Sequence, residues 1–313
     1  MVRMLKIMAT KKRTPTGILL YLLRSTWNEM QDDHIMKFSA ALAYYTVFSL
    51  GPLLLILISL GGLFFGKNAV EGQLYGQVRD LVGSKAALLI QETIKNIHLS
   101  GQNILKTIIG VLSLLLGASG VFGEIQDSIN SIWGFKSKPR SGLRLLIINR
   151  LLSFSMVAAL GFLLMVSLFF NVLLAALGNS IGNYFPGFSI VVLFIINNLL
   201  TFAVISLLFA IIFKVLPDAR IRWKDVRTGA MLTALLFMLG KYLIGLYLGK
   251  SQVASAFGAT GSVILIMVWV YYNAVILYAG AEFTQVLTRS QGREIQPNEY
   301  AVKMVQKTVE AKS

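Results

Sequence analysis

Six long apolar stretches alternate with polar, mostly basic connections along this chain of 313 residues. A helix needs about 20 apolar residues to cross a hydrocarbon core of about 30 Å, and each stretch is close to that length or longer. Lipid offers no hydrogen-bond partner to backbone N–H and C=O groups, so segments of this kind must be helical. The pattern predicts an all-α, polytopic membrane protein with six transmembrane helices, at about 38–65, 104–122, 151–177, 189–213, 229–248 and 258–281.

Shorter amphipathic stretches accompany the six spans. Between residues 16 and 36, Leu19, Leu22 and Trp27 recur at helical spacing while Arg24 and Glu29 face elsewhere, which is typical of a helix at the membrane interface. Its apolar stripe is expected to lie on the inner leaflet or to pack under the bundle. The expected divisions are a cytoplasmic basic lead with this interfacial helix at 1–37, a six-span membrane domain at 38–282 with an outer helical segment at 66–103, and a polar cytoplasmic tail at 283–313, mobile beyond Ser290.

Composition and charge support the membrane class and predict its orientation. The chain is 56% hydrophobic and 14% charged, which is unlike a soluble domain. Of its 29 Lys and Arg residues, 22 lie before span one, after spans two and four, and in the tail, whereas five lie in the other three connections. The positive-inside rule then places both termini in the cytoplasm.

The net charge of +15 has the same explanation. Basic residues at span ends match the inner boundary and its anionic headgroups, so membrane lipids are the expected partners and no nucleic acid is expected. Basic residues that alternate with apolar ones beside a tryptophan suit the headgroup layer in particular. The predicted headgroup-interface residues are Arg220, Arg222, Trp223 and Lys224.

Polar side chains interrupt the apolar stretches, although burial in a membrane penalises them. Glu124, Asp127 and Asn130 step by three residues and share a helix face. Such groups either line a path for a polar solute or hydrogen-bond neighbouring helices and hold the bundle together. Lys241 has the further alternative of snorkelling to the outer surface, and Pro52 is expected to kink the first span. The predicted polar path, open to the inner side, comprises Glu124, Asp127, Asn130, Arg150, Asn197, Asn198, Lys214, Lys241, Asn273 and Glu282.

Catalytic and metal chemistry have little to build on in this sequence. Cysteine is absent and there are two histidines, His34 and His98, so disulfides, thiolate sites and multi-histidine metal sites are excluded. Glu124 and Asp127 are a candidate pair for one Mg²⁺, but an ion-pair network with nearby basic residues is the simpler interpretation. We expect a protein that is not an enzyme and that holds no metal or cofactor.

Three separated motifs carry a family resemblance. Residues 40–54 (AALAYYTVFSLGPLL), 126–134 (QDSINSIWG) and 257–283, with its Gly-Ala-Glu-Phe ending, resemble the YihY/BrkB family, and the similarity covers roughly 24–290. The resemblance implies a bacterial cytoplasmic (inner) membrane protein with six spans. The matching positions are Tyr44, Tyr45, Pro52, Gln126, Asn130, Trp133, Pro217, Gly258, Gly261 and Glu282.

The family's labels differ in value for this chain. Some members are called virulence factor BrkB, and others were once called ribonuclease BN. Phosphodiester hydrolysis usually needs bound metal ions or an acid–base pair at the scissile phosphate. This sequence has no histidine cluster and no cysteine, so nuclease activity is not expected.

The leading functional hypothesis is transport or flipping of an amphipathic, anionic envelope lipid or a related solute. The sequence contains no nucleotide-binding P-loop, so uphill movement would have to use an ion gradient or a partner. The alternative is a non-catalytic membrane scaffold or regulator of envelope processes. A third hypothesis is an oligomeric channel, because small-residue faces on spans two, five and six permit a homo-oligomer.

Overall fold

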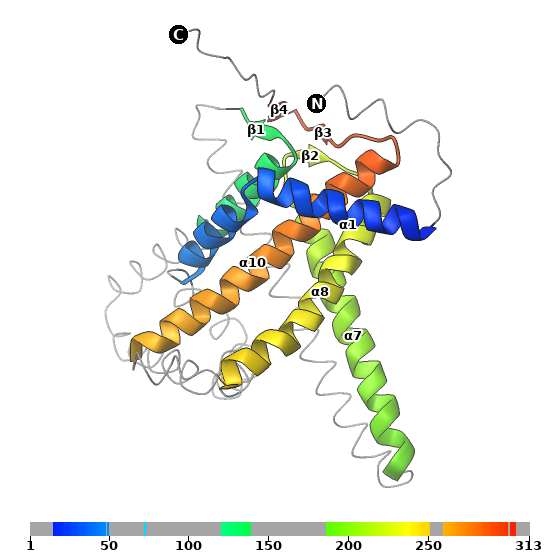
Figure 1. The fold of residues 1–313 in the computed structure, drawn as a ribbon, viewed down its shortest axis with the longest axis vertical. Coiled ribbons are helices and arrows are strands. Elements are labelled where there is room, and N and C mark those ends of the chain that lie inside the picture. The colour runs from blue at the N-terminus through cyan, green and yellow to red at the C-terminus, as the bar shows by residue number, and fades with distance from the viewer. Residues whose placement is uncertain are drawn as a thin grey trace, which may run out of the picture.

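The computed structural model describes residues 15–47, 49, 72, 120–138, 186–250, 259–299 and 301–304. The outer segment 66–103 apart from Gly72, the span 151–177, most of the span 104–122, and the residues Arg150 and Pro52 lie outside the described residues. Long helices dominate the described part (Figure 1). They are α1 (Pro15–Asp32), α7 (Pro186–Val215), α8 (Trp223–Lys250) and α10 (Ala259–Ser290), and residues 35–47 and 120–132 are also helical.

Two helical segments in the described part are long and apolar enough to cross a membrane, Ile195–Val215 in α7 and Ile266–Ser290 in α10. Large apolar side chains of α7, such as Ile195 and Leu199, are exposed, which suits a helix in contact with lipid. In α8, Leu239 and Leu243 are exposed in the same way. The mainly helical fold is confirmed, whereas the total of six spans stays a prediction.

Helix α8 packs against both α7 and α10, and its contact with α10 is unusually close. Gly229 of α8 faces the side chain of Thr284 of α10, and Gly280 of α10 faces Thr233 of α8. Each threonine hydroxyl donates a hydrogen bond of 2.7 Å to the carbonyl oxygen four residues earlier in its own helix, which belongs to Gly229 or Gly280. This reciprocal pairing, which we call the Gly–Thr seam, lets the two backbones approach closely.

Two short antiparallel ribbons lie at one end of the helices, which we call the ribbon end (Figure 1). Strand β1 (Phe135–Ser137) pairs with β4 (Ala301–Lys303), and β2 (Ala219–Arg220) pairs with β3 (Gln296–Pro297). The strands were not predicted, and they qualify the all-α prediction. The expectation of a mobile tail beyond Ser290 is wrong for residues 296–298 and 301–304, because backbone hydrogen bonds join them to the segments 134–137 and 218–220.

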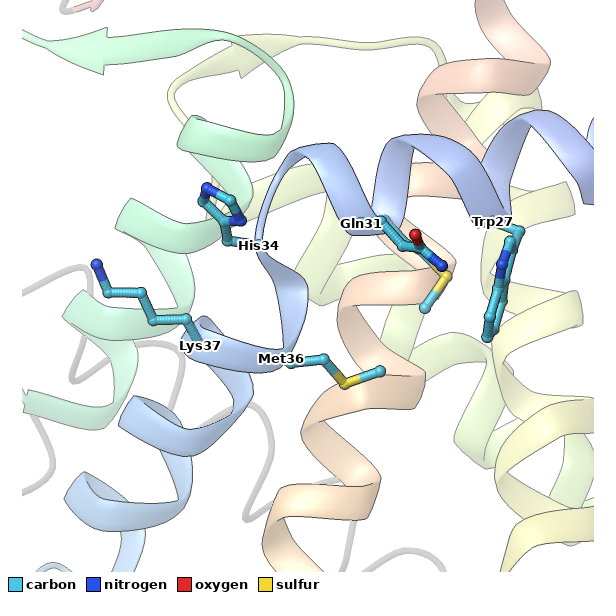
Figure 2. Close-up of a pocket in the computed structure, with 6 residues that line it drawn as sticks. Trp27, Gln31, His34, Met36 and Lys37 are labelled. Carbon is cyan, nitrogen blue, oxygen red and sulfur yellow. The ribbon is translucent and has the colours of Figure 1, made fainter.

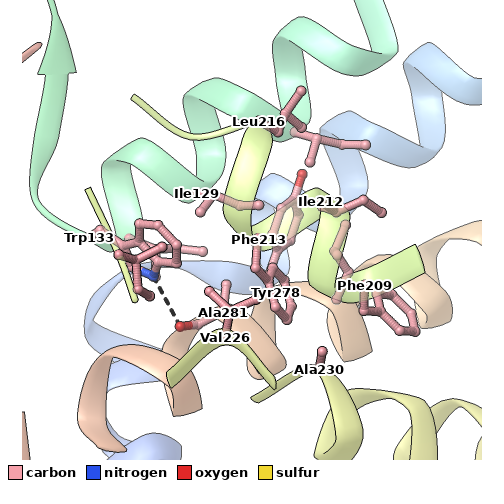
Figure 3. Close-up of a cluster of buried hydrophobic side chains, with 14 of the residues drawn as sticks. Ile129, Trp133, Phe209, Ile212, Phe213, Leu216, Val226, Ala230, Tyr278 and Ala281 are labelled. Carbon is pink, nitrogen blue, oxygen red and sulfur yellow. Dashed lines mark hydrogen bonds between the residues drawn. The ribbon is translucent and has the colours of Figure 1, made fainter. Parts of the chain in front are cut away.

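A buried apolar cluster lies just inside the ribbon end, where four helices meet (Figure 3). Phe213 of α7, Val226 of α8, Tyr278 of α10 and Ile129 of the 120–132 helix belong to this cluster, and all four side chains are buried. Trp133 completes the cluster, since its indole Nε1–H donates a hydrogen bond of 3.0 Å to the carbonyl oxygen of Ala281. The cluster ties the family motif at 126–134 to α10.

Helix α1 lies across α10 at the ribbon end (Figure 1). Its buried Leu22 packs against Phe283, Val286 and Leu287, beyond the predicted end of span six. Another side of α1 exposes apolar residues, and Leu20 is 71% exposed there. The predicted apolar stripe therefore divides into a narrow edge against α10 and a wider exposed face suited to lipid.

Candidate functional site

The residues of the predicted polar path occupy several different environments. Asn130 is buried, and its amide clamps Asp218: Nδ2–H donates to Oδ2 at 3.1 Å, while Oδ1 accepts the Asp218 backbone N–H at 2.8 Å. The hydroxyl of Ser137 donates to the same Asp218 oxygen at 2.7 Å. Asn130 therefore joins the 120–132 helix to the loop after α7, and Ser137 joins β1 to the same loop.

Three other residues of the predicted polar path also make local contacts. Lys214 donates a hydrogen bond to the carbonyl oxygen of Ile221, and its Nζ lies 5.9 Å from the centre of the Trp223 ring. Asn273 donates to the carbonyl oxygen of Trp269 in its own helix at 2.6 Å. Glu124 accepts a hydrogen bond of 3.3 Å from Ser128.

Four more residues of the predicted path are exposed or half-buried: Asp127, Asn197 and Lys241 are exposed, and Asn198 is half-buried. Arg150 lies outside the described residues. A shared path for the ten residues stays a prediction.

The predicted headgroup-interface residues lie at the ribbon end, on β2 and at the start of α8. Arg220, Arg222, Trp223 and Lys224 are all exposed, and Arg220 forms an ion pair of 3.1 Å with Glu299. An exposed ion pair contributes little to stability. These cations remain accessible to anionic groups at a membrane surface.

Glu282 is the member of the predicted path with the most unusual surroundings. Its residue is 0% exposed, and neither carboxyl oxygen receives a hydrogen bond from a donor group in the described part of the chain. Its polar neighbours are instead two other carboxyls, those of Asp33 and Glu29. The three form a carboxyl cluster where α1 crosses α10.

One cation accompanies the carboxyl cluster. Arg289, two turns after Glu282 in α10, donates a hydrogen bond of 2.7 Å to Oε2 of Glu29, and both side chains are partly exposed. Burial raises the pKa of the Asp33 carboxyl, interaction with the neighbouring Glu282 carboxyl acts in the opposite direction, and repulsion from Glu29 raises it further. One guanidinium thus faces three acidic groups.

Sequence reasoning included Glu282 but missed Asp33 and Glu29. Leu22, Thr26, Glu29 and Asp33 follow one another at intervals of four, three and four residues, so they continue one face of α1 and the turn after it. Leu22 and Thr26 are buried in the structure, and the face becomes acidic toward Glu282. This spacing was the signal that could have identified the cluster.

A cavity of about 610 Å³ opens beside α1, the turn after it and the start of the 35–47 helix (Figure 2). Its walls combine apolar, amide and cationic side chains, and one wall residue, Met36, accepts a hydrogen bond of 3.1 Å from the Tyr271 hydroxyl. Next to it, His34 adopts a left-handed backbone conformation with φ 55°, in the turn that redirects the chain from α1 into the 35–47 helix. The lining residues are Trp27, Met30, Gln31, His34, Met36 and Lys37.

The chemistry available at this end of the molecule is proton exchange and anion attraction. No group of three His, Asp or Glu residues in the described part of the chain has a geometry that could hold a metal ion. A buried carboxyl beside other carboxyls is a group that can bind and release a proton. The cavity beside α1 offers an ammonium and a largely apolar wall.

Comparison with known proteins identifies a family. The sequence model of the family described as Virulence factor BrkB matches residues 26–304. A UPF0761 membrane protein of Psychromonas ingrahamii is 27% identical over 286 residues, covering 90% of this chain and 91% of the relative. One of Pseudoalteromonas atlantica is 27% identical and covers 83% of both chains, and one of Stenotrophomonas maltophilia is 25% identical, covering 83% of this chain and 59% of its longer relative.

No solved structure gives a significant match. The family match nevertheless includes the 126–134 motif, the clamp at Asp218 and the whole of α10. The predicted resemblance is confirmed, and the chain is a membrane protein that belongs to the Virulence factor BrkB family.

Proposed function

We propose that this protein moves an amphipathic, anionic envelope lipid between the leaflets of the bacterial cytoplasmic membrane. The observation that carries the proposal is the cavity of about 610 Å³ under α1, which combines apolar walls with a cation. A lipid needs both kinds of surface at once, because its headgroup is charged and its chains are not.

The cavity lining divides into two chemical parts. Trp27, Met30 and Met36 offer apolar surface, and methionine side chains adapt to irregular partners. Lys37 offers an ammonium suited to a phosphate or carboxylate, and Gln31 offers an amide that can donate or accept. Figure 2 shows Lys37 and Trp27 on opposite sides, with Met36 and Gln31 between them. The cation and an aromatic wall thus lie at separate ends of the site.

The location of the cavity supports entry from the membrane surface. Ile18, Leu19, Leu20 and Leu23 of α1 are exposed, as expected for a helix lying among headgroups. Exposed basic residues at β2 and the start of α8 would raise the local concentration of anionic lipids at the same end. A lipid could then reach the cavity sideways without crossing water.

Reconstitution tests the proposal. The protein would be placed in vesicles of phosphatidylcholine with a trace of fluorescent phosphatidylglycerol, and lipid movement would be followed by quenching the outer leaflet with a membrane-impermeant reductant. We expect faster movement of the anionic probe than of fluorescent phosphatidylcholine. Movement no faster than in protein-free vesicles would refute the proposal.

A charge reversal tests the role of the cavity. Lys37→Glu should slow the anionic probe at least about tenfold, because it places a like charge against the headgroup, equivalent to about 1.4 kcal/mol. Lys303→Glu is the matched control, since Lys303 is exposed on β4, far along the chain from the cavity lining. If both variants move lipid at the wild-type rate, the cavity is not the entry site.

A second candidate function, a membrane scaffold or regulator, is favoured by the local contacts of Asn130, Lys214 and Asn273. In that case these polar groups stabilise the bundle and no solute touches them. The same vesicles discriminate the two functions, because a scaffold would leave every probe lipid in its original leaflet.

A further inference from the structure

The carboxyl of Glu282 is fully buried, and neither of its oxygens has a hydrogen-bond donor in the described part of the chain. An isolated ionised carboxylate is very costly to bury, and proteins usually avoid that cost by keeping the group neutral. Glu282 also faces two further carboxyls, so ionisation would place like charges together. Both facts favour a carboxyl that carries a proton.

The charged neighbours of Glu282 come from two elements. From α1 and the turn after it come Glu29 and Asp33, and Asp32 acts on Asp33. From α10 itself comes Arg289, which is already hydrogen-bonded to Glu29 at 2.7 Å. No cation therefore contacts Glu282 directly in the described structure.

Three other elements pack on this part of α10 through side chains that carry no charge. The 35–47 helix contacts α10 through Phe38 at Tyr278 and Met36 at Tyr271. Helix α8 presents Thr233 against Gly280, and the 120–132 helix ends at Trp133, which bonds the Ala281 carbonyl oxygen. The nearest acidic groups of these two elements are engaged elsewhere. Asp225 forms an ion pair with Arg293, and Glu124 accepts from Ser128.

We infer that Glu282 is a proton-binding site, and that its proton is shared with Asp33 and holds α1 against α10. The proton comes from water, binds one carboxyl oxygen of Glu282, and is donated in a hydrogen bond to a carboxylate oxygen of Asp33. Loss of the proton leaves Glu282, Asp33 and Glu29 ionised together, and their repulsion separates α1 from α10. This inference does not depend on what the protein transports.

Loss of the proton from Glu282 would also affect the cavity, because α1 contributes to both sites. Trp27, Met30 and Gln31 of α1 line the cavity, and Leu22 of the same helix is buried against α10. A movement of α1 away from α10 therefore exposes Leu22 and changes the cavity wall at once. A proton would control the cavity without entering it.

Thiol labelling provides the first test, because the natural chain has no cysteine. Leu22→Cys in the full-length protein, reconstituted in phosphatidylcholine vesicles, should be protected at acidic pH and labelled by a water-soluble maleimide at alkaline pH. One linked proton changes the population by up to about tenfold per pH unit. Asn28→Cys, exposed on the polar side of α1, corrects for the pH dependence of the reagent itself.

A second substitution tests whether Glu282 is the group that binds the proton. Glu282→Gln mimics the protonated acid and should keep Leu22→Cys protected at every pH, whereas Glu294→Gln, an exposed carboxyl paired with Lys303, should leave the wild-type profile unchanged. A persistent pH dependence in Glu282→Gln would overturn the inference. A labelling rate that follows sodium concentration at constant pH would also overturn it, in favour of a metal cation.

Infrared difference spectroscopy keeps the test valid if the cysteine variants fold poorly. Spectra of the natural protein at acidic and alkaline pH should differ by the carbonyl band of a protonated carboxyl. Glu282→Gln should lose that band, and Glu294→Gln should keep it. A band that survives Glu282→Gln assigns the proton to another group and refutes the proposal.

Discussion

The Gly–Thr seam between α8 and α10 allows a sharp test of how the helices are held together. A methyl group built on Gly280 would lie 2.9 Å from Cβ and 3.0 Å from Cγ2 of Thr233, and closer still to its hydroxyl. Carbon atoms in contact prefer about 3.5–4.0 Å. Thr233 cannot easily turn away, because it is buried, β-branched and hydrogen-bonded to Gly229.

The expected cost of Gly280→Ala follows from two opposing terms. Overpacking a well-packed site costs about 1–3 kcal/mol, and a clash with a fixed side chain belongs at the upper end of that range. Replacing glycine by alanine inside a helix returns about 1 kcal/mol. The net loss in the free energy of unfolding should be about 1–2 kcal/mol.

A double-mutant cycle isolates the contact itself. Thr233→Ala removes the hydroxyl and Cγ2 and leaves only Cβ of the clashing atoms, so the pair Gly280→Ala and Thr233→Ala should be more stable than the sum of the single changes by about 1–3 kcal/mol. Equilibrium unfolding in mixed detergent micelles, followed by circular dichroism, measures all four proteins. Gly123→Ala is the control, because a methyl group there meets nothing within 4 Å.

Two results would contradict the reasoning. Gly280→Ala as stable as Gly123→Ala would mean that the helices do not approach closely in the membrane. A cycle energy near zero would mean that any loss comes from a source other than Thr233.

Further predictions concern the ribbon end and the topology. Asn130→Ala should lower the free energy of unfolding by about 1–3 kcal/mol, because the partly buried backbone N–H of Asp218 loses its hydrogen-bond partner, and limited proteolysis should then cut the loop near Asp218 faster. Trp133→Phe should cost about 1 kcal/mol through loss of the 3.0 Å bond to α10, in the same unfolding assay. Lys303 lowers the pKa of Glu294, so their pairing should persist at neutral pH and be lost as the pH falls well below 4.5, seen as faster proteolysis of the ribbon. Reporter fusions should place both termini in the cytoplasm, and opposite locations would refute the charge-based orientation.

The spans that the described residues include were largely readable from the sequence, but their ends were not. Span six was predicted to end at 281, whereas α10 continues to Ser290. The extension carries Thr284 and Thr288, which lower its mean hydropathy. Their hydroxyls donate hydrogen bonds to carbonyl oxygens of the same helix. Protein contacts with Leu22, rather than lipid, stabilise this last part, and hydropathy does not measure such contacts.

The strands could not be predicted for a different reason. Each has two or three residues, which is too short for an alternating pattern to be visible. Their pairing joins segments separated by 76 residues or more, so no local signal specifies it.

The candidate site was predictable in part. Glu282 was identified because a carboxyl near a span is conspicuous. Glu29 was placed only on a face of α1 away from its apolar stripe, since a single helix does not reveal which edge its partner will cover. Once Leu22 is known to face α10, Glu29 and Asp33 follow from helical spacing, so the missing information was the docking of one helix on another.

The ribbons have a consequence for biogenesis. Each joins a loop made earlier in synthesis to residues 296–303 near the end of the described chain, so neither can form until that segment has left the ribosome. Until then, the loops that carry β1 and β2 have no strand partner. The membrane insertion machinery or a chaperone would have to protect those loops during that interval. The two ribbons therefore form late, after the helices have been inserted and once β3 and β4 have been synthesised.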